Sequence, residues 1–139
     1  MCGGVQYSVQ GKTINIYFPN PKAQLPVRMK DQSIELMPWG RRKNESGHLP
    51  PGGWARHESV LKGTWDKYQP VPVKIQVDSF MEKDLNKVSH WFDLEEDQFI
   101  QGLLAQWDDE YRVYVVTISP PMDDPVHNRW PRIIKGSFY

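Results

Sequence analysis

The chain contains 139 residues, with 17 lysine and arginine residues balanced by 17 aspartate and glutamate residues, so its formal net charge is +0. This length predicts a single domain over residues 1–139 that can bury a core of its own. The single cysteine excludes an internal disulfide bond and every multi-cysteine zinc motif, and we expect neither a metal nor a cofactor. The longest apolar run is far shorter than a membrane span, so we expect no membrane partner and a cytoplasmic location.

The zero net charge conceals an asymmetry between the two halves of the chain. Residues 1–74 hold eleven Lys/Arg and five Asp/Glu, a net of +6, whereas residues 75–139 hold six and twelve, a net of −6. This pattern is compatible with a basic face that binds an anionic partner. It is equally compatible with a domain whose charges are solvated and complement one another.

Short stretches of partial alternation, separated by Gly, Pro, Asn and Asp, predict antiparallel strands along most of the chain. The first three are Val5 to Val9, Lys12 to Phe18 and Ser33 to Met37. Asn44 to Gly53 predicts an exposed loop, and Glu58 to Lys67 predicts a short helix that Gly63 weakens. Four further strands are expected at Val71 to Phe80, Val88 to Leu94, Phe99 to Trp107 and Tyr111 to Ser119, and the segment from Pro120 to Arg132 is expected to be irregular. The predicted class is α+β and β-rich, with mainly antiparallel strands in a barrel-like core and few short helices.

The most informative residue is the lone cysteine at position 2. If Met1 is removed, Cys2 carries an α-amine and a thiol on neighbouring carbons. An α-amine has a reference pKa of about 7.7 to 8.0, so about a third of it is neutral near pH 7.4 and able to attack an aldehyde. The adjacent thiol can then close onto the same carbon to give a thiazolidine ring. Although a lone cysteine is usually a small buried hydrophobe, its position at the chain terminus favours this covalent chemistry.

Other candidate residues are individually weak signals. Glu82 lies at the end of a predicted strand, where its carboxylate could transfer protons, and His127 lies in a proline-flanked loop with an ordinary pKa suited to acid–base work. Basic residues also alternate with aromatic residues, a pattern that fits phosphate contacts and base stacking on single strands, although tryptophans in a small β domain usually pack in the core. The residues of this pattern are Trp39, Arg41, Arg42, Trp54 and Arg56.

The order of these signals resembles the SOS-response-associated peptidase family. The matching motifs extend over nearly the whole chain and are Met1-Cys2-Gly3, Trp39-Gly40, Ala55-Arg56-His57-Glu58, Phe80-Met81-Glu82 and His127-Asn128-Arg129-Trp130-Pro131. The resemblance implies a sensor of abasic sites in single-stranded DNA that forms a covalent thiazolidine crosslink through Cys2, with crosslinking or lyase activity and autoproteolytic removal of Met1. It implies a monomer that acts in the DNA damage response, at the nucleoid if the host is bacterial.

The resemblance also assigns roles by position. Cys2 would be the nucleophile, Glu82 would shuttle protons and His127 would assist opening of the deoxyribose ring. Arg56 would hold a phosphate, and Gly3 would let the backbone approach the DNA closely. The other expected DNA contacts are Trp39, Arg41, Arg42, Trp54 and Arg129.

This chain departs from the family pattern at several positions. Trp54 stands where the family usually has asparagine, Gly4 replaces a common arginine, and Trp130 replaces a methionine. An indole can donate one hydrogen bond but cannot accept one, so it replaces an amide only in part. Two other classes therefore stay open: an N-terminal-nucleophile amidohydrolase or peptidase, and a noncatalytic protein that binds single-stranded DNA.

Overall fold

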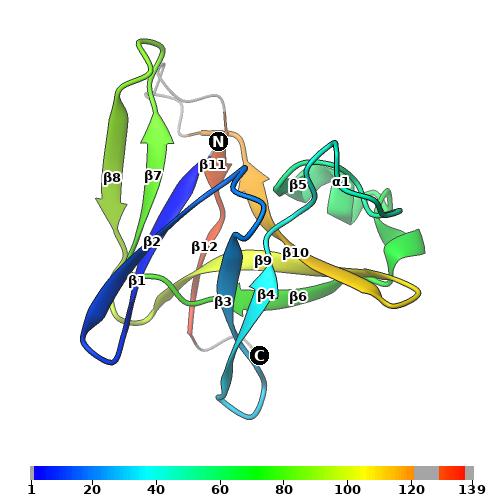
Figure 1. Cartoon of the computed structure of the whole chain (residues 1–139), viewed down its shortest axis with the longest axis horizontal. Coiled ribbons are helices and arrows are strands. Elements are labelled where there is room, and N and C mark those ends of the chain that lie inside the picture. Colours follow the sequence, from blue (N-terminus) through cyan, green and yellow to red (C-terminus); the bar gives the residue numbers. More distant parts are fainter. Residues whose placement is uncertain (1, 121–128, 137–139) are drawn as a thin grey trace.

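The computed structural model describes residues 2–120 and 129–136, whose strands form two sheets (Figure 1). The smaller sheet has the order β2-β1-β7-β8 and is entirely antiparallel. Its strands are β1 (Gly4–Val9), β2 (Lys12–Tyr17), β7 (Ser79–Lys83) and β8 (Ser89–Asp93). The start of β1, where Cys2 enters the fold, therefore lies beside β7.

The larger sheet has eight strands, six of them in the order β11-β10-β9-β6-β3-β4. Its longest members are β9 (Gln98–Trp107) and β10 (Glu110–Ile118), and the others on this path are β3 (Gln24–Arg28), β4 (Ile34–Pro38), β6 (Val71–Ile75) and β11 (Trp130–Pro131). Two further strands lie off this path: β12 (Ile133–Lys135) pairs antiparallel with β9, and β5 (Trp54–Arg56) pairs parallel with β10. The prediction of a β-rich, mainly antiparallel fold is thus confirmed.

The expected barrel is not confirmed by the strand pairings of the described residues. The larger sheet curls so that the chain after β4 approaches β10, but among the described residues the pairing of the two backbones is limited to an isolated bridge between Trp39 and Val113. A closed barrel needs a continuous ladder between its first and last strands. The described strands therefore form an open, curled sheet beside the smaller one.

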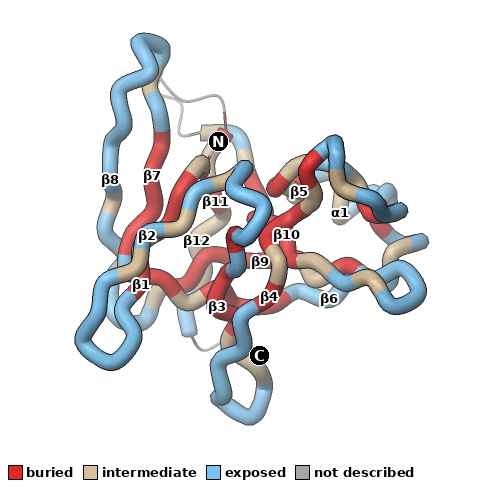
Figure 2. Tube along the Cα trace, viewed as in Figure 1, coloured by how far each residue is buried: buried red, intermediate tan, exposed pale blue. Residues whose placement is uncertain are grey.

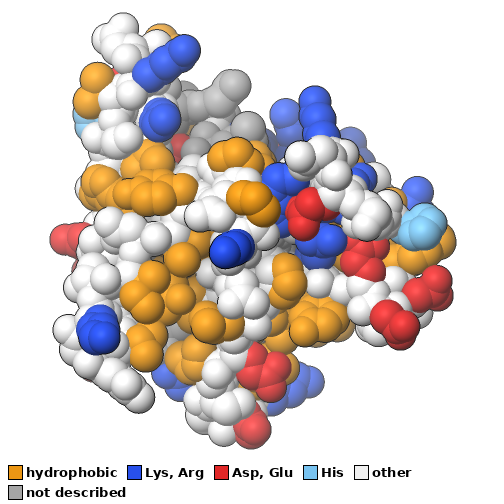
Figure 3. All heavy atoms as spheres, viewed as in Figure 1, with side chains coloured by type: hydrophobic (Ala, Val, Ile, Leu, Met, Phe, Trp, Pro, Cys, Tyr) orange, Lys and Arg blue, Asp and Glu red, His pale blue; other side chains and the backbone are white. Residues whose placement is uncertain are grey.

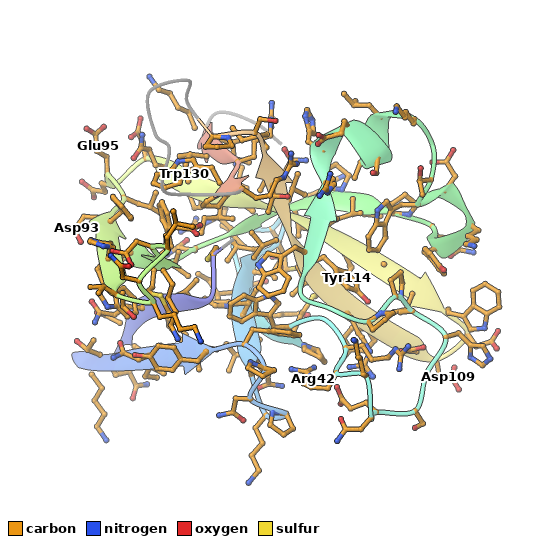
Figure 4. The ribbon with its side chains drawn as sticks, turned by 90° about the horizontal axis from the view of Figure 1, so that it is seen from above. Arg42, Asp93, Glu95, Asp109, Tyr114 and Trp130 are labelled. Carbon is orange, nitrogen blue, oxygen red and sulfur yellow. The ribbon has the colours of Figure 1, made fainter. Side chains whose placement is uncertain are left out.

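Two apolar clusters fill this architecture, and they lie on opposite faces of β10. Val113 and Val115 point into the larger cluster, which both sheets share, whereas Tyr114 and Val116 point into a smaller cluster. This division follows from the alternation of side chains along a strand. Figure 4 shows Tyr114 and Trp130 well apart, with Trp130 toward the side of β8, where Asp93 is labelled. Burial is greatest where strands of the two sheets meet and least at the hairpin tips (Figure 2).

The helical segment is shorter than predicted. Helix α1 (His57–Leu61) ends early, and a separate 3₁₀ turn, η1 (Asp66–Tyr68), follows it. Gly63 lies between them with a φ of +85°, a left-handed conformation that favours glycine and interrupts a helix. In the described parts of the chain, the helices are too short to cross a membrane.

The single strand predicted over Val71 to Phe80 is wrong, because the chain changes sheets within it. Strand β6 ends at Ile75 in the larger sheet, and β7 begins at Ser79 in the smaller one. Between them, Gln76 donates its N–H to the Pro26 carbonyl at 2.9 Å, and Asp78 donates to the Gln6 carbonyl at 2.8 Å. At this corner the strand that accepts the backbone hydrogen bonds therefore changes from β3 to β1. No turn signal in the sequence marks the change.

Candidate functional site

The first residues of the chain are held on both sides by hydrogen bonds. Gly3 donates its N–H to the Met81 carbonyl at 3.0 Å and accepts one from the Phe18 N–H at 3.2 Å. The indole Nε1–H of Trp54 donates to the carbonyl oxygen of Cys2 at 2.7 Å. These bonds come from β7, from the end of β2 and from β5, so the approach to β1 is fixed rather than frayed.

Trp54 is itself positioned by packing. Its ring contacts the edge of Phe18 with a centroid separation of 4.9 Å, and the side chain is half-buried. Phe18 thereby supports the site twice, through its backbone N–H on Gly3 and through its ring against Trp54. Sequence reasoning missed Phe18 because a backbone donor leaves no signature in residue type.

The Cys2 side chain is fully buried, and its thiol donates to the Gly4 carbonyl at 3.4 Å. Burial raises the pKa of this thiol to about 12, and the nearby carboxylate of Glu82 contributes to the rise. Both effects disfavour the thiolate, the first by desolvation and the second by repulsion between like charges. At neutral pH the Cys2 sulfur is therefore a protonated thiol.

Glu82 is brought to Cys2 by the pairing of β1 with β7. In that ladder Gly4 lies opposite Met81, so Gly3, the residue next to Cys2, lies opposite Glu82, whose carboxylate is close enough to the Cys2 thiol to raise the pKa of that thiol. Glu82 is fully buried and shares a face of β7 with Phe80, which belongs to the larger apolar cluster. The structure thus brings together two of the three predicted catalytic residues.

The third predicted catalytic residue, His127, lies outside the described residues. Trp130 of the same motif is described, and it packs edge-on against Phe80 at 5.4 Å and against Phe92 at 4.9 Å between ring centroids. Trp130 therefore reaches the face of β7 that also carries Glu82.

Arg129 connects this motif to helix α1. Its two terminal nitrogens bind the two carboxylate oxygens of Glu58 at 3.0 and 2.7 Å, and the guanidinium also donates to the side chain and carbonyl of Thr117. The hydrogen bond from Arg129 lowers the pKa of Glu58 to about 2. Arg129 is buried, so in this structure it joins two motifs internally instead of facing a DNA phosphate as expected.

Three other expected DNA contacts are also engaged within the fold. Trp39 is fully buried and donates its indole N–H to the Gly53 carbonyl at 2.9 Å, so it has no exposed face for stacking on a base. Arg41 donates to the carbonyls of Leu49 and Glu45, each at 2.6 Å. Arg42, labelled in Figure 4, is buried and donates to the carbonyls of Asn20 and Gly40 and to the Glu45 carboxylate. These side chains hold the loop over residues 40–53 in place.

The remaining expected contacts lie at or near Cys2. Gly3 and Trp54 touch it directly, as described above, and Arg56 is exposed at the end of β5, two residues beyond Trp54. Arg56 also lies close enough to Glu58 to help lower the pKa of that carboxyl. Its exposed guanidinium is available to an anionic partner beside the site.

The described residues contain no group of three His, Cys, Asp or Glu side chains that could hold a metal ion. The groups at Cys2 are instead a buried thiol and a nearby carboxylate, which suit covalent and proton-transfer chemistry. Comparison of the chain with protein-family models, curated proteins and solved structures finds no match.

Proposed function

We propose that this protein senses abasic sites in single-stranded DNA and crosslinks to them through a thiazolidine ring at Cys2 after Met1 is removed. The observation that carries the proposal is the proximity of the Cys2 thiol to the buried carboxylate of Glu82 at the start of a fixed strand. The motif resemblance to SOS-response-associated peptidases supports the choice of lesion, because a ring-opened abasic sugar carries an aldehyde. We further propose that the protein acts as a monomer in the cytoplasm, where chromosomal DNA is its partner.

In the proposed reaction, the free α-amine of Cys2 attacks the aldehyde carbon first. Uptake of one proton from solvent and loss of one water give an iminium, and the Cys2 sulfur then bonds to the same carbon while its proton passes to the Glu82 carboxylate, which returns it to solvent. The products are a thiazolidine and one water, so no oxidant or cofactor is consumed. The family resemblance assigns opening of the sugar ring to His127.

The protonated state of the thiol favours this order of events. With a pKa of about 12, about one Cys2 thiol in 10⁵ is ionised at pH 7, which is a poor starting point for direct attack by sulfur. The amine step needs no thiolate, and Glu82 lies near the thiol to accept its proton when the iminium forms. An amidohydrolase that attacks an amide with its N-terminal thiolate would need the opposite shift in the pKa of that thiol.

The hydrogen bond from Trp54 to Cys2 matters because Trp54 stands where the family usually has asparagine. An indole and an amide both donate an N–H, so a donor to the Cys2 carbonyl is retained in this chain. The exposed Arg56 would contact a phosphate beside the lesion.

The proposal is tested by mixing the purified protein with a single-stranded oligonucleotide that carries one abasic site and separating the products under denaturing conditions. We expect a stable adduct with the native chain and none with Cys2→Ala. Cys2→Ser keeps the amine, so it should give an adduct only when a reducing agent traps the iminium. Salt-sensitive binding without any adduct would contradict the proposal and support a noncatalytic binder, whereas hydrolysis of glutamine would support an amidohydrolase.

A further inference from the structure

A row of four residues crosses the smaller sheet next to Cys2. In the register of that sheet Tyr17 lies opposite Gly4, Gly4 lies opposite Met81, and Met81 lies opposite Trp91. Directly paired residues project to the same face, and Phe80 on the neighbouring position of β7 points into the core. The row therefore lies on the outer face of the sheet.

Tyr17 and Trp91 meet above this row and remain open to solvent. Their ring centroids are 6.3 Å apart with the planes at 77°, and the side chains are 44% and 39% exposed, whereas Met81 beneath them is 4% exposed. We call Tyr17, Trp91 and the underlying Met81 the aromatic platform. An exposed pair of large aromatic rings in mutual contact is a feature of binding surfaces.

Gly4 makes the platform possible. A Cβ atom at this position would lie 2.9 Å from Cδ1 of Tyr17, which is closer than real Cβ contacts allow. The Tyr17 ring therefore covers the backbone of β1 only because residue 4 has no side chain. The departure from arginine at this position removes a cation and admits an aromatic ring.

The surroundings of the platform fit a single strand of DNA. Lys83, two residues beyond Met81 on the same face of β7, is exposed and could contact a phosphate. Figure 3 shows hydrophobic side chains gathered over β7, β8 and the adjoining strands, and Lys and Arg side chains gathered around β5 and α1 on the same face. The start of β1 lies between these two regions (Figure 1). Aromatic rings beside basic groups are the usual means of holding single strands without sequence preference.

We propose that the aromatic platform stacks a base of the DNA strand that flanks the abasic nucleotide. Gly4, which the Tyr17 ring covers, follows Cys2 by two residues, so this edge of the platform is about 7 Å of extended chain from the reactive residue. That distance is about two stacking steps of 3.4 Å, which suits a base within two nucleotides of the lesion rather than the lesion itself. The inference rests on the proposed function for its partner and adds the site that grips the undamaged part of the strand.

The test uses a fluorescent single-stranded oligothymidine without abasic sites, so that crosslinking does not contribute to the signal. Trp91→Ala should weaken binding by about 5- to 150-fold, the range that alanine substitution gives at a stacking site, and Trp91→Phe should restore most of the affinity. Trp107→Ala is the matched control, because Trp107 is 37% exposed but lies on the β9–β10 hairpin at the far side of the molecule (Figure 1). Tyr17→Ala tests the other ring of the platform. Its matched control is Tyr111→Ala, because Tyr111 is 50% exposed and Tyr17 is 44% exposed.

Salt dependence separates stacking from phosphate contact. Trp91→Ala should leave the slope of log K against log salt unchanged, whereas Lys83→Ala should lower its magnitude by about 0.7. Equal affinities of Trp91→Ala and Trp107→Ala, with both variants folded by circular dichroism, would overturn the proposal. The two proposals can be refuted separately. Crosslinking that does not depend on Trp91 would refute the role of the aromatic platform. Trp91-dependent binding without crosslinking would refute the proposed reaction.

Discussion

Replacing Trp54 with phenylalanine deletes one hydrogen bond and keeps an aromatic ring against Phe18. The lost bond is the 2.7 Å contact from the indole N–H to the Cys2 carbonyl. A bond of this kind contributes about 0.5–1.5 kcal/mol, and leaving its buried acceptor without that donor raises the cost to about 1–3 kcal/mol. For a domain of this size each kcal/mol lowers the thermal midpoint by about 3–4 °C, so we expect a drop of about 3–12 °C.

The same substitution should slow the proposed crosslinking. If the indole fixes the Cys2 backbone for attack, about 1 kcal/mol of lost positioning makes adduct formation about fivefold slower in a single-turnover assay. Tyr114→Phe is the matched control, because the Tyr114 hydroxyl also donates to a backbone carbonyl, that of Pro50, at 2.7 Å. It lies in the other apolar cluster, so it should lower stability without changing the rate. Equal rates for Trp54→Phe and the native chain, or equal slowing by both variants, would refute this reasoning.

Three further predictions concern titratable groups. The sole cysteine should react with iodoacetamide at a rate that rises about tenfold per pH unit from pH 8 to 11, because the pKa of its thiol is about 12. A rate that reaches a plateau near pH 9 in the folded protein would contradict the burial of this thiol. Glu82→Gln should raise the reactivity of that thiol at pH 9, since one cause of the raised pKa is removed, yet slow adduct formation by about 10²-fold or more. Because the pKa of Glu58 is lowered, its ion pair with Arg129 stabilises the fold above about pH 4.5 and loses that contribution as the pH falls toward about 2. Glu58→Gln should therefore flatten the dependence of the thermal midpoint on pH across that window, and a slope equal to that of the native chain would contradict it.

Much of the fold was predictable wherever strands alternate and turn residues separate them. The hairpin of β1 and β2 and the long pair β9 and β10 match their predicted ranges closely. Strand β3 was not predicted, because Pro26 argues against a strand. The pairing of β3 with β6 begins only at Val27, so the N–H that Pro26 lacks removes no hydrogen bond from the β3–β6 ladder. Strands of two or three residues, such as β11, are too short to show periodicity.

The site was predictable in its residue types more than in its contacts. Motif order indicated Cys2 and Glu82, but it is the register of β1 against β7, with Gly3 opposite Glu82, that brings the Glu82 carboxylate near the Cys2 thiol. Arg42 and Arg129 look like surface cations in the sequence, yet backbone carbonyls and the carboxylates of Glu45 and Glu58 take up their donors. Sequence pattern cannot separate an arginine that binds phosphate from one that closes a loop, because both need the same fork of donors.

The most direct test of the central claim is the mass and linkage of the adduct formed with an abasic oligonucleotide. We predict a species whose mass equals the chain without Met1 plus the oligonucleotide minus one water, with the peptide linkage at Cys2 and no remaining free thiol. An adduct on a lysine, an adduct at Cys2 that retains a free thiol, or a reactive chain that still carries Met1 would contradict the account.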